Sequence, residues 1–262
     1  MSSPRTQRPS LRRNDGFTLI ELLVAMLAGT VLTMAAFSFL IFTTEDVSHI
    51  TARVGVDQTG RVALQNIASR LHDACEAPNI TPIQEGSTGS VIKFLSNYGE
   101  QSSLPLKLHE IIYTPASGSK EGTLVEDVYE RTGGTAPKYT WATTPTTTKL
   151  LTGVRQTQFG SETPTPVFQY FRYYQSSDSI PTGDTSIPYG ELNKTAITEV
   201  KTAAEAEDIT KVTVSFTVAP EGHEVASFNH DRPVPLENSV LFRLAPSSES
   251  PSNPNLPCTE KT

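Results

Sequence analysis

Hydrophobic and polar positions show an uninterrupted apolar run near the start of the chain. From Leu22 to Phe42, 21 residues follow one another without a charged residue, His, Asn, Gln or Pro. At 1.5 Å per residue, a helix of this length is roughly 31 Å long, which is enough to cross the core of a bilayer. Residues 17–42 are therefore predicted to form a transmembrane helix.

Beyond Phe42 the apolar residues recur at helical spacing instead of filling every position. They form two stripes, the first made of Val47, Ile50 and Val54 and the second of Leu64, Ile67, Leu71 and Cys75. Residues 43–77 are therefore expected to continue the same helix, with both stripes packed under a sheet. The phase of the pattern slips between Gly55 and Gly60, which predicts a bend or local unwinding there, and Pro78 marks the end of the helix.

From residue 79 onward the pattern has the period of β-strands. The segments with this pattern are Val91–Ser96, Leu108–Thr114, Thr123–Arg131, Leu150–Phe159, Val167–Tyr174, Ile209–Ala219 and Ser239–Leu244. A short helix is expected at Thr198–Glu207, and Gly133–Lys149 and Gln175–Gly190 are interpreted as loops from their composition. Strands without repeated crossover helices favour an antiparallel sheet. The expected fold class is α+β, with the long helix packed on a β-rich head at 78–245 and a low-complexity tail at 246–262.

The first 16 residues are basic, whereas the rest of the chain is acidic. The charged residues of this segment are Arg5, Arg8, Arg12, Arg13 and Asp15. Its net charge is thus +3, and because the whole chain carries −7, residues 17–262 carry −10. This asymmetry predicts a cytoplasmic N-terminus and a head outside the cytoplasm. A cleaved secretory signal does not fit, because the apolar run is too long and no small-residue cleavage site follows it.

The ten residues from Gly16 to Ala25 read Gly-Phe-Thr-Leu-Ile-Glu-Leu-Leu-Val-Ala and follow the basic segment. This combination resembles the N-terminal signature of type IV prepilins. The resemblance implies that a prepilin peptidase cuts between Gly16 and Phe17 on the cytoplasmic side and N-methylates Phe17. It also implies that residues 1–16 are a leader removed on maturation, and that the apolar helix is kept as a membrane anchor and later becomes the core of a filament.

Glu21 is a carboxylate at the start of this apolar helix. A charge in the middle of a membrane helix costs on the order of 3 kcal/mol on insertion scales and is usually functional. Near the headgroups the cost is small, but inside a bundle of such helices an unpaired carboxylate is costly and needs a partner. The new amine of Phe17 in a neighbouring subunit is the expected partner, and the equivalent glutamate of pilins has that role. A plain signal anchor is the simpler interpretation, but it leaves Gly16 and Phe17 unexplained.

A second, narrower resemblance concerns the head. Its segments follow one another in the order Leu151–Val154, Val167–Tyr170, a helical stretch, Ile209–Ser215 and Ser239–Arg243. This order looks like that of the larger minor pilins and of the J-type minor pseudopilin of type II secretion. The helical segment Ala68–Ala74 is similar to theirs, whereas Leu244 departs from the pattern, since those proteins often have asparagine there.

The chain contains two cysteines, Cys75 and Cys258, both in the part expected outside the cytoplasm. An even pair in that location usually forms a disulfide. Closing a loop of about 184 residues would contribute roughly 5 kcal/mol in the chain-entropy model. A Cys75–Cys258 disulfide is therefore predicted, and two independent buried thiols are the alternative.

The residue types that carry catalysis or bind metals form no recognisable motif in this sequence. The histidines are His49, His72, His109, His223 and His230. None has zinc-protease spacing, and Cys-x-x-Cys, a Gly-rich phosphate loop and Gly-x-Ser-x-Gly do not occur. His223-Glu224 with His230-Asp231 is the single cluster, and its simpler interpretation is a polar loop. We therefore expect no enzyme activity, no metal and no cofactor, and the charge pattern gives no sign of nucleic-acid binding.

The function expected from these features is that of a minor pilin or pseudopilin that primes or caps a filament of a type IV pilus or a type II secretion-like system. Its partners would be the prepilin peptidase, other pilin or pseudopilin subunits, an assembly platform protein with its ATPase, and the membrane. It would cross the cytoplasmic (inner) membrane once and then enter an extracellular filament, and the large head favours the tip. The alternative is a membrane-tethered binding or enzymatic domain that does not polymerise. The sequence does not choose between pilus, competence and secretion systems.

Overall fold

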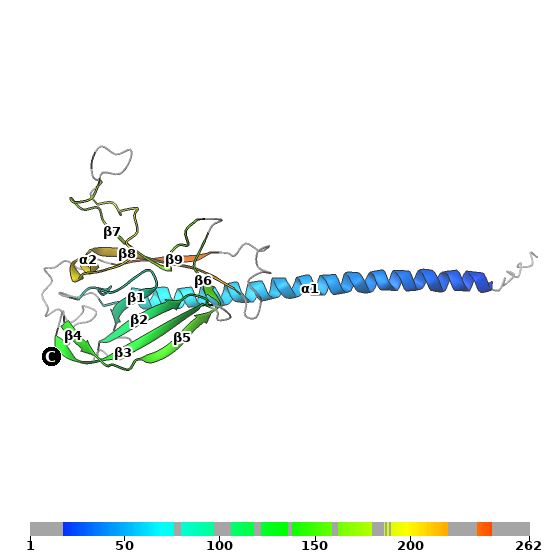
Figure 1. The fold of residues 1–262 in the computed structure, drawn as a ribbon, viewed down its shortest axis with the longest axis horizontal. Coiled ribbons are helices and arrows are strands. Elements are labelled where there is room, and N and C mark those ends of the chain that lie inside the picture. Colours follow the sequence, from blue (N-terminus) through cyan, green and yellow to red (C-terminus); the bar gives the residue numbers. More distant parts are fainter. Residues whose placement is uncertain are drawn as a thin grey trace, which may run out of the picture. The chain divides into compact units, whose positions relative to one another are not determined.

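The computed structural model describes residues 18–75, 80–96, 106–117, 122–135, 138–158, 162–179, 186, 188, 190–219 and 235–242. Residues 1–51 and 52–262 form two units, which are described separately. One element, α1, runs from Leu19 to His72 (Figure 1). It continues through Gly55 and Gly60, so the local unwinding expected there does not occur.

The first sheet has five strands and is antiparallel throughout. Its strands are β1 (Val91–Ser96), β2 (Lys107–Thr114), β3 (Thr123–Thr135), β4 (Lys138–Trp141) and β5 (Thr146–Thr152). β2 lies between β1 and β3, and β3 pairs with both β4 and β5. Side chains alternate between the two faces of a strand, and this alternation places Ile92, Phe94, Ile111 and Leu124 together on one face, where all four are completely buried.

The second sheet has four strands, with β8 pairing with each of the other three. Its strands are β6 (Val154–Arg155), β7 (Phe168–Arg172), β8 (Ile209–Val218) and β9 (Leu236–Leu241). The short helix α2 (Ala203–Asp208) leads directly into β8, and the hydroxyl of Thr202 caps it by accepting a hydrogen bond from the N–H of Glu205 at 3.2 Å. On β8, Val212, Val214 and Phe216 alternate with hydroxyl-bearing residues, which gives the strand one apolar face.

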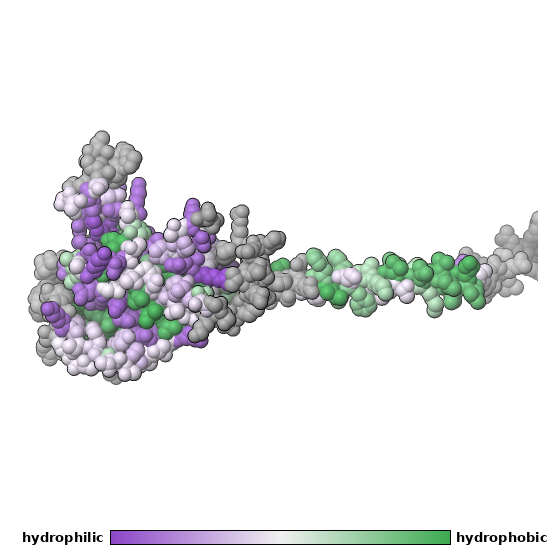
Figure 2. Space-filling model, viewed as in Figure 1, coloured by the Kyte–Doolittle hydropathy of each residue, from purple (hydrophilic) through white to green (hydrophobic). Residues whose placement is uncertain are grey.

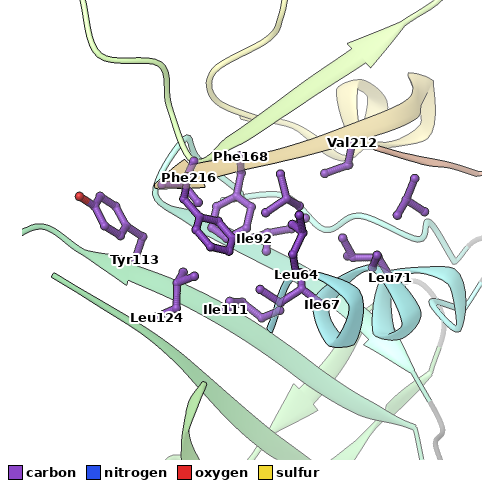
Figure 3. Packing of buried hydrophobic residues seen from close by; sticks show 14 of the residues in the cluster. Leu64, Ile67, Leu71, Ile92, Ile111, Tyr113, Leu124, Phe168, Val212 and Phe216 are labelled. Carbon is purple, nitrogen blue, oxygen red and sulfur yellow. The ribbon is translucent and has the colours of Figure 1, made fainter. Parts of the chain in front are cut away.

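The core of the second unit forms where side chains of α1 and of both sheets meet. Leu64, Ile67 and Leu71 of α1 are 6%, 0% and 0% exposed. Figure 3 shows them beside Ile92, Ile111 and Leu124 of the first sheet and beside Phe168, Val212 and Phe216 of the second. Burying a side chain of this size completely stabilises the fold by about 2 kcal/mol. The helix is therefore held by the stripe that the sequence predicts for it.

Gly60 is the point at which α1 most closely approaches the second sheet. A Cβ atom at this position would lie 2.5 Å from Cδ1 of Leu236 and 2.9 Å from Cγ2 of Val218. At Gly55, one and a half turns earlier, a Cβ atom would meet nothing within 4 Å. The two glycines between which the sequence predicts a bend thus differ, because Gly60 makes room for β8 and β9 whereas Gly55 has open space around it.

Tyr170 joins the two sheets through its hydroxyl. Its side chain is completely buried on β7, and the hydroxyl donates to the backbone oxygen of Thr88 at 2.9 Å and is 3.1 Å from that of Val91, the first residue of β1. Burial raises the pKa of the Tyr170 phenol, so the group stays protonated and able to donate.

The predicted α+β class is confirmed: a long N-terminal helix is followed by antiparallel sheets. Besides the unwinding at Gly55–Gly60, further details of the prediction are wrong. The segment 133–149 is not a loop, since it contains β4 and the start of β5, and its β-branched threonines suit a strand at the sheet edge. The stripe of Val47, Ile50 and Val54 is not packed under a sheet, because these side chains are 61%, 62% and 50% exposed.

Candidate functional site

The helix α1 begins in a reciprocal capping arrangement between Thr18 and Glu21. The hydroxyl of Thr18 accepts a hydrogen bond from the N–H of Glu21 at 3.3 Å. The carboxylate of Glu21 in turn lies 3.4 Å from both the N–H and the hydroxyl of Thr18, which donate to it. This is a capping box, in which Ser or Thr at the N-cap and Glu three residues later satisfy free N–H groups of the first turn.

The capping box defines where the helix starts relative to the predicted cleavage point. Gly16 and Phe17 lie outside the described residues, and Thr18 is the N-cap immediately after them. The Glu21 carboxylate is exposed in the first turn, where the helix dipole favours a negative charge. An accessible carboxylate therefore lies three residues after the helix N-cap.

The residues that follow Glu21 form a helix segment suited to a bilayer. Leu19–Thr44, 26 residues with a mean hydropathy of 2.1, is the one candidate membrane span among the described residues, and none of its most apolar window is buried within the chain. At 1.5 Å per residue it is about 39 Å long, against a hydrocarbon core of about 30 Å. Figure 2 shows its surface as almost continuously hydrophobic. The segment needs an apolar environment that the chain itself does not supply.

Four threonines in this segment present little polar surface to that environment. The hydroxyl of Thr30 donates to the carbonyl of Leu27 at 2.8 Å, and that of Thr33 donates to the carbonyl of Gly29 at 2.6 Å. Thr43 and Thr44 donate in the same way to carbonyls three or four residues earlier. Hydroxyls bonded back to their own helix are compatible with a membrane, where unpaired polar groups are costly.

Comparison with known families supports this interpretation of the N-terminus. Residues 11–37 match the family model described as the prokaryotic N-terminal methylation motif. This is the signal of type IV pilins and pseudopilins, and the matched region contains Gly16, Phe17, Glu21 and the first part of the apolar segment. The chain accordingly carries the type IV pilin or pseudopilin signal at the start of a helix that is long and apolar enough to cross a membrane. No curated protein and no solved structure matches the chain.

The structure describes one of the two cysteines of the predicted disulfide. Cys75 lies just beyond the end of α1 and is completely buried, and its N–H donates to the carbonyl of Leu95 at 2.7 Å. Cys258 lies outside the described residues, so the Cys75–Cys258 bond stays a prediction. The same holds for the cluster around His223 and His230, which also falls outside them.

A buried charged cluster joins α1 to the first sheet, and sequence reasoning missed it. Arg70 of α1 forms an ion pair with Oε2 of Glu126 on β3, and Oε1 of Glu126 is 2.9 Å from Nδ1 of His109 on β2. The Glu126 and His109 side chains are 3% and 6% exposed, and the His109 ring stacks on Phe94 with centroids 5.2 Å apart. The strand alternation that turns Ile111 inward also turns its neighbours His109 and Glu126 inward, and that signal could have revealed them.

The cluster requires an uncharged imidazole. Burial is the main cause that lowers the pKa of His109 from 6.5 to about 4, followed by the nearby positive charges of Arg70 and Lys107, with a small opposing effect of Glu130. Because a carboxylate only accepts hydrogen bonds, the neutral ring donates its Nδ1–H to Glu126. The arrangement balances one carboxylate with one guanidinium and therefore secures α1 to the sheet. Among the described residues no group of three or more His, Cys, Asp and Glu side chains is placed to hold a metal.

Proposed function

We propose that this chain is a minor pilin or pseudopilin whose precursor is cut by a prepilin peptidase between Gly16 and Phe17 and methylated on the new amine of Phe17. The mature protein crosses the membrane once, with its N-terminus in the cytoplasm and its head outside. It then acts by assembly, together with other pilin subunits, a platform protein and its ATPase. It is a structural subunit and not an enzyme.

One observation carries this proposal. The methylation motif at residues 11–37 covers the capped start of an apolar helix, and none of the most apolar window of this helix is buried. A signal that is cut before the helix leaves a predominantly apolar helical segment of 26 residues on the mature protein. A bilayer and, later, a bundle of similar helices are the two environments that cover such a surface on all sides.

Glu21 has the position that the assembly step requires. Its carboxylate is exposed and is held near the helix start by two contacts of 3.4 Å, with the N–H and the hydroxyl of Thr18. When α1 enters a bundle, this carboxylate leaves water and needs a positive partner. The amine of Phe17 in a neighbouring subunit supplies it, because both groups lie within one turn of the start of the mature chain.

The test compares two substitutions at the capping box. Glu21→Ala removes the cap and the charge, whereas Thr18→Ala removes the cap at a cost of about 1 kcal/mol and keeps the charge. We expect both variants to insert into the membrane, and Glu21→Ala to be strongly depleted from sheared filaments, while Thr18→Ala is depleted much less. Equal incorporation of Glu21→Ala and the unchanged protein would overturn the pairing. A chain that is processed but never found in filaments would favour a tethered domain.

A further inference from the structure

A second hydrophobic cluster lies beside the end of α1, separate from the main core. Its buried members are Cys75, Ile80, Leu95 and Leu106, and Leu108, Tyr139 and Trp141 pack against it while remaining partly accessible. The cluster includes the cysteine for which a disulfide is predicted. The two aromatic residues come from β4, the strand that sequence analysis did not anticipate.

The aromatic pair forms a surface of defined geometry. Tyr139 and Trp141 are two positions apart on β4 and therefore lie on the same face. Their ring centroids are 5.8 Å apart and the ring planes are inclined by 56°. The guanidinium of Arg131, which pairs with Trp141 across the strands, lies 5.3 Å from the centre of the Tyr139 ring. Two tilted, half-buried rings fixed by a neighbouring strand are the kind of surface that binds proline-rich peptides.

The C-terminal sequence provides a segment that fits this surface. Prolines occur at 251, 254 and 257, and Cys258 follows immediately. A polyproline II helix has three residues per turn, so prolines at this spacing share one face. Cys258 is the predicted partner of Cys75, and Cys75 belongs to the same cluster as the two rings. The 16 positions from Phe242 to Cys258 span up to roughly 50 Å when extended.

We propose that Tyr139 and Trp141 form a proline-binding surface, and that its occupant is the segment Pro251–Pro257 of the same chain, tethered by a Cys75–Cys258 disulfide. Proline rings present flat apolar faces to the aromatic rings, and a preformed polyproline helix loses little entropy on docking. The tether makes the docking intramolecular and raises the effective concentration of the segment to the millimolar range. Neither the surface nor its occupant depends on filament assembly.

Fluorescence tests this surface directly, since Trp141 is the single tryptophan of the chain. The full-length protein in detergent micelles is compared with a variant carrying Pro251→Ser, Pro254→Ser and Pro257→Ser. We expect the variant to emit at longer wavelength and to be quenched by acrylamide about twofold more strongly. The reason is that removing the prolines uncovers the Trp141 ring, which becomes more accessible to water and to the quencher. The matched control carries Ser252→Ala, Asn253→Ala and Asn255→Ala, which alter the positions between the prolines, and should behave like the unchanged protein.

Two further measurements separate the occupant from the alternatives. A synthetic peptide of residues 249–257, added to the proline variant, should reverse the fluorescence change, and a peptide with serines in place of the prolines should not. Peptide mapping without reduction should recover the Cys75–Cys258 link. The proposal would be overturned by unchanged fluorescence in the proline variant, by an equal change in the control or by two free thiols. It would also be overturned by a signal that depends on protein concentration, because such a signal comes from binding to a second copy. Filament incorporation is a separate readout, so its loss would leave this result intact.

Discussion

The two halves of α1 both contain many apolar residues, yet the chain covers only one of them. Large apolar side chains such as Leu27 and Leu32 in the first half are 63% and 71% exposed, whereas Ile67 and Leu71 in the second half are completely buried. The first half is apolar on all sides and the second on one side only. A helix that is apolar on all sides therefore indicates that its surface is covered from outside the chain, whereas a one-sided apolar stripe indicates cover by the chain itself.

The stretch between these two halves is an exception to that rule. Val47, Ile50 and Val54 form a one-sided stripe, but half or more of each side chain is exposed. The sheets first approach the helix closely at Gly60, where Leu236 and Val218 lie near it. Periodicity therefore predicts that a helix face will be covered, but it does not say whether the cover comes from the same chain.

The largest effect on stability is expected from a cavity in the covered half of α1. Ile67→Ala should lower the free energy of unfolding of the head by about 4 kcal/mol, because it removes a completely buried side chain from a packed core. Leu27→Ala, at a position that is 63% exposed, should leave that free energy unchanged. Denaturant unfolding of the detergent-solubilised protein measures both. Similar losses for the two variants would contradict the assignment of their environments.

The charged cluster of Arg70, Glu126 and His109 is expected to make the stability of the head depend on pH. Because the pKa of His109 falls from 6.5 in the unfolded chain to about 4 in the folded one, the neutral ring stabilises the fold fully above pH 6.5. This contribution is lost as pH falls toward 4 and amounts to about 3 kcal/mol. His109→Gln keeps a donor for Glu126 but cannot titrate, so its stability should fall less steeply with pH between 6.5 and 4. His72→Gln, at an exposed position of α1, should keep the original slope; identical slopes for all three proteins would refute the role of His109.

The smallest effect concerns Gly55 and Gly60 of α1. Alanine favours a helix over glycine by about 1 kcal/mol, so Gly55→Ala, with open space around it, should stabilise the head slightly or leave it unchanged. Gly60→Ala should instead destabilise it by about 1 kcal/mol net, because the new methyl group displaces Leu236 and Val218. Paired thermal unfolding curves give the sign of each change. A stabilised Gly60→Ala variant would show that β8 and β9 do not pack closely on the helix.

Local patterns predicted much of the fold because they report which face of an element is apolar. β1 begins and ends at the predicted residues, and β8 differs from its prediction only at its last residue, since alternation over a long strand is unambiguous. β4 was missed because Gly133, Gly134 and the surrounding threonines are typical of loops, and only pairing with β3 makes the segment a strand. Local sequence does not contain that pairing.

The candidate functional site likewise has a part that the sequence predicts and a part that it does not. The motif around Glu21 could be predicted because its meaning lies in consecutive residues. Arg70 instead pairs with Glu126, 56 positions away in the chain, and forms one cluster with Glu126 and His109. Such distant ion pairs follow from topology, which the order of residues specifies only through the complete fold.

The intact mass of the protein extracted from membranes tests the central claim most directly, because it reports cleavage and methylation together while showing whether the apolar helix is retained. We expect a chain that begins at Phe17 and carries an added methyl group. A chain that begins at Met1, or one that begins beyond Phe42, would contradict it.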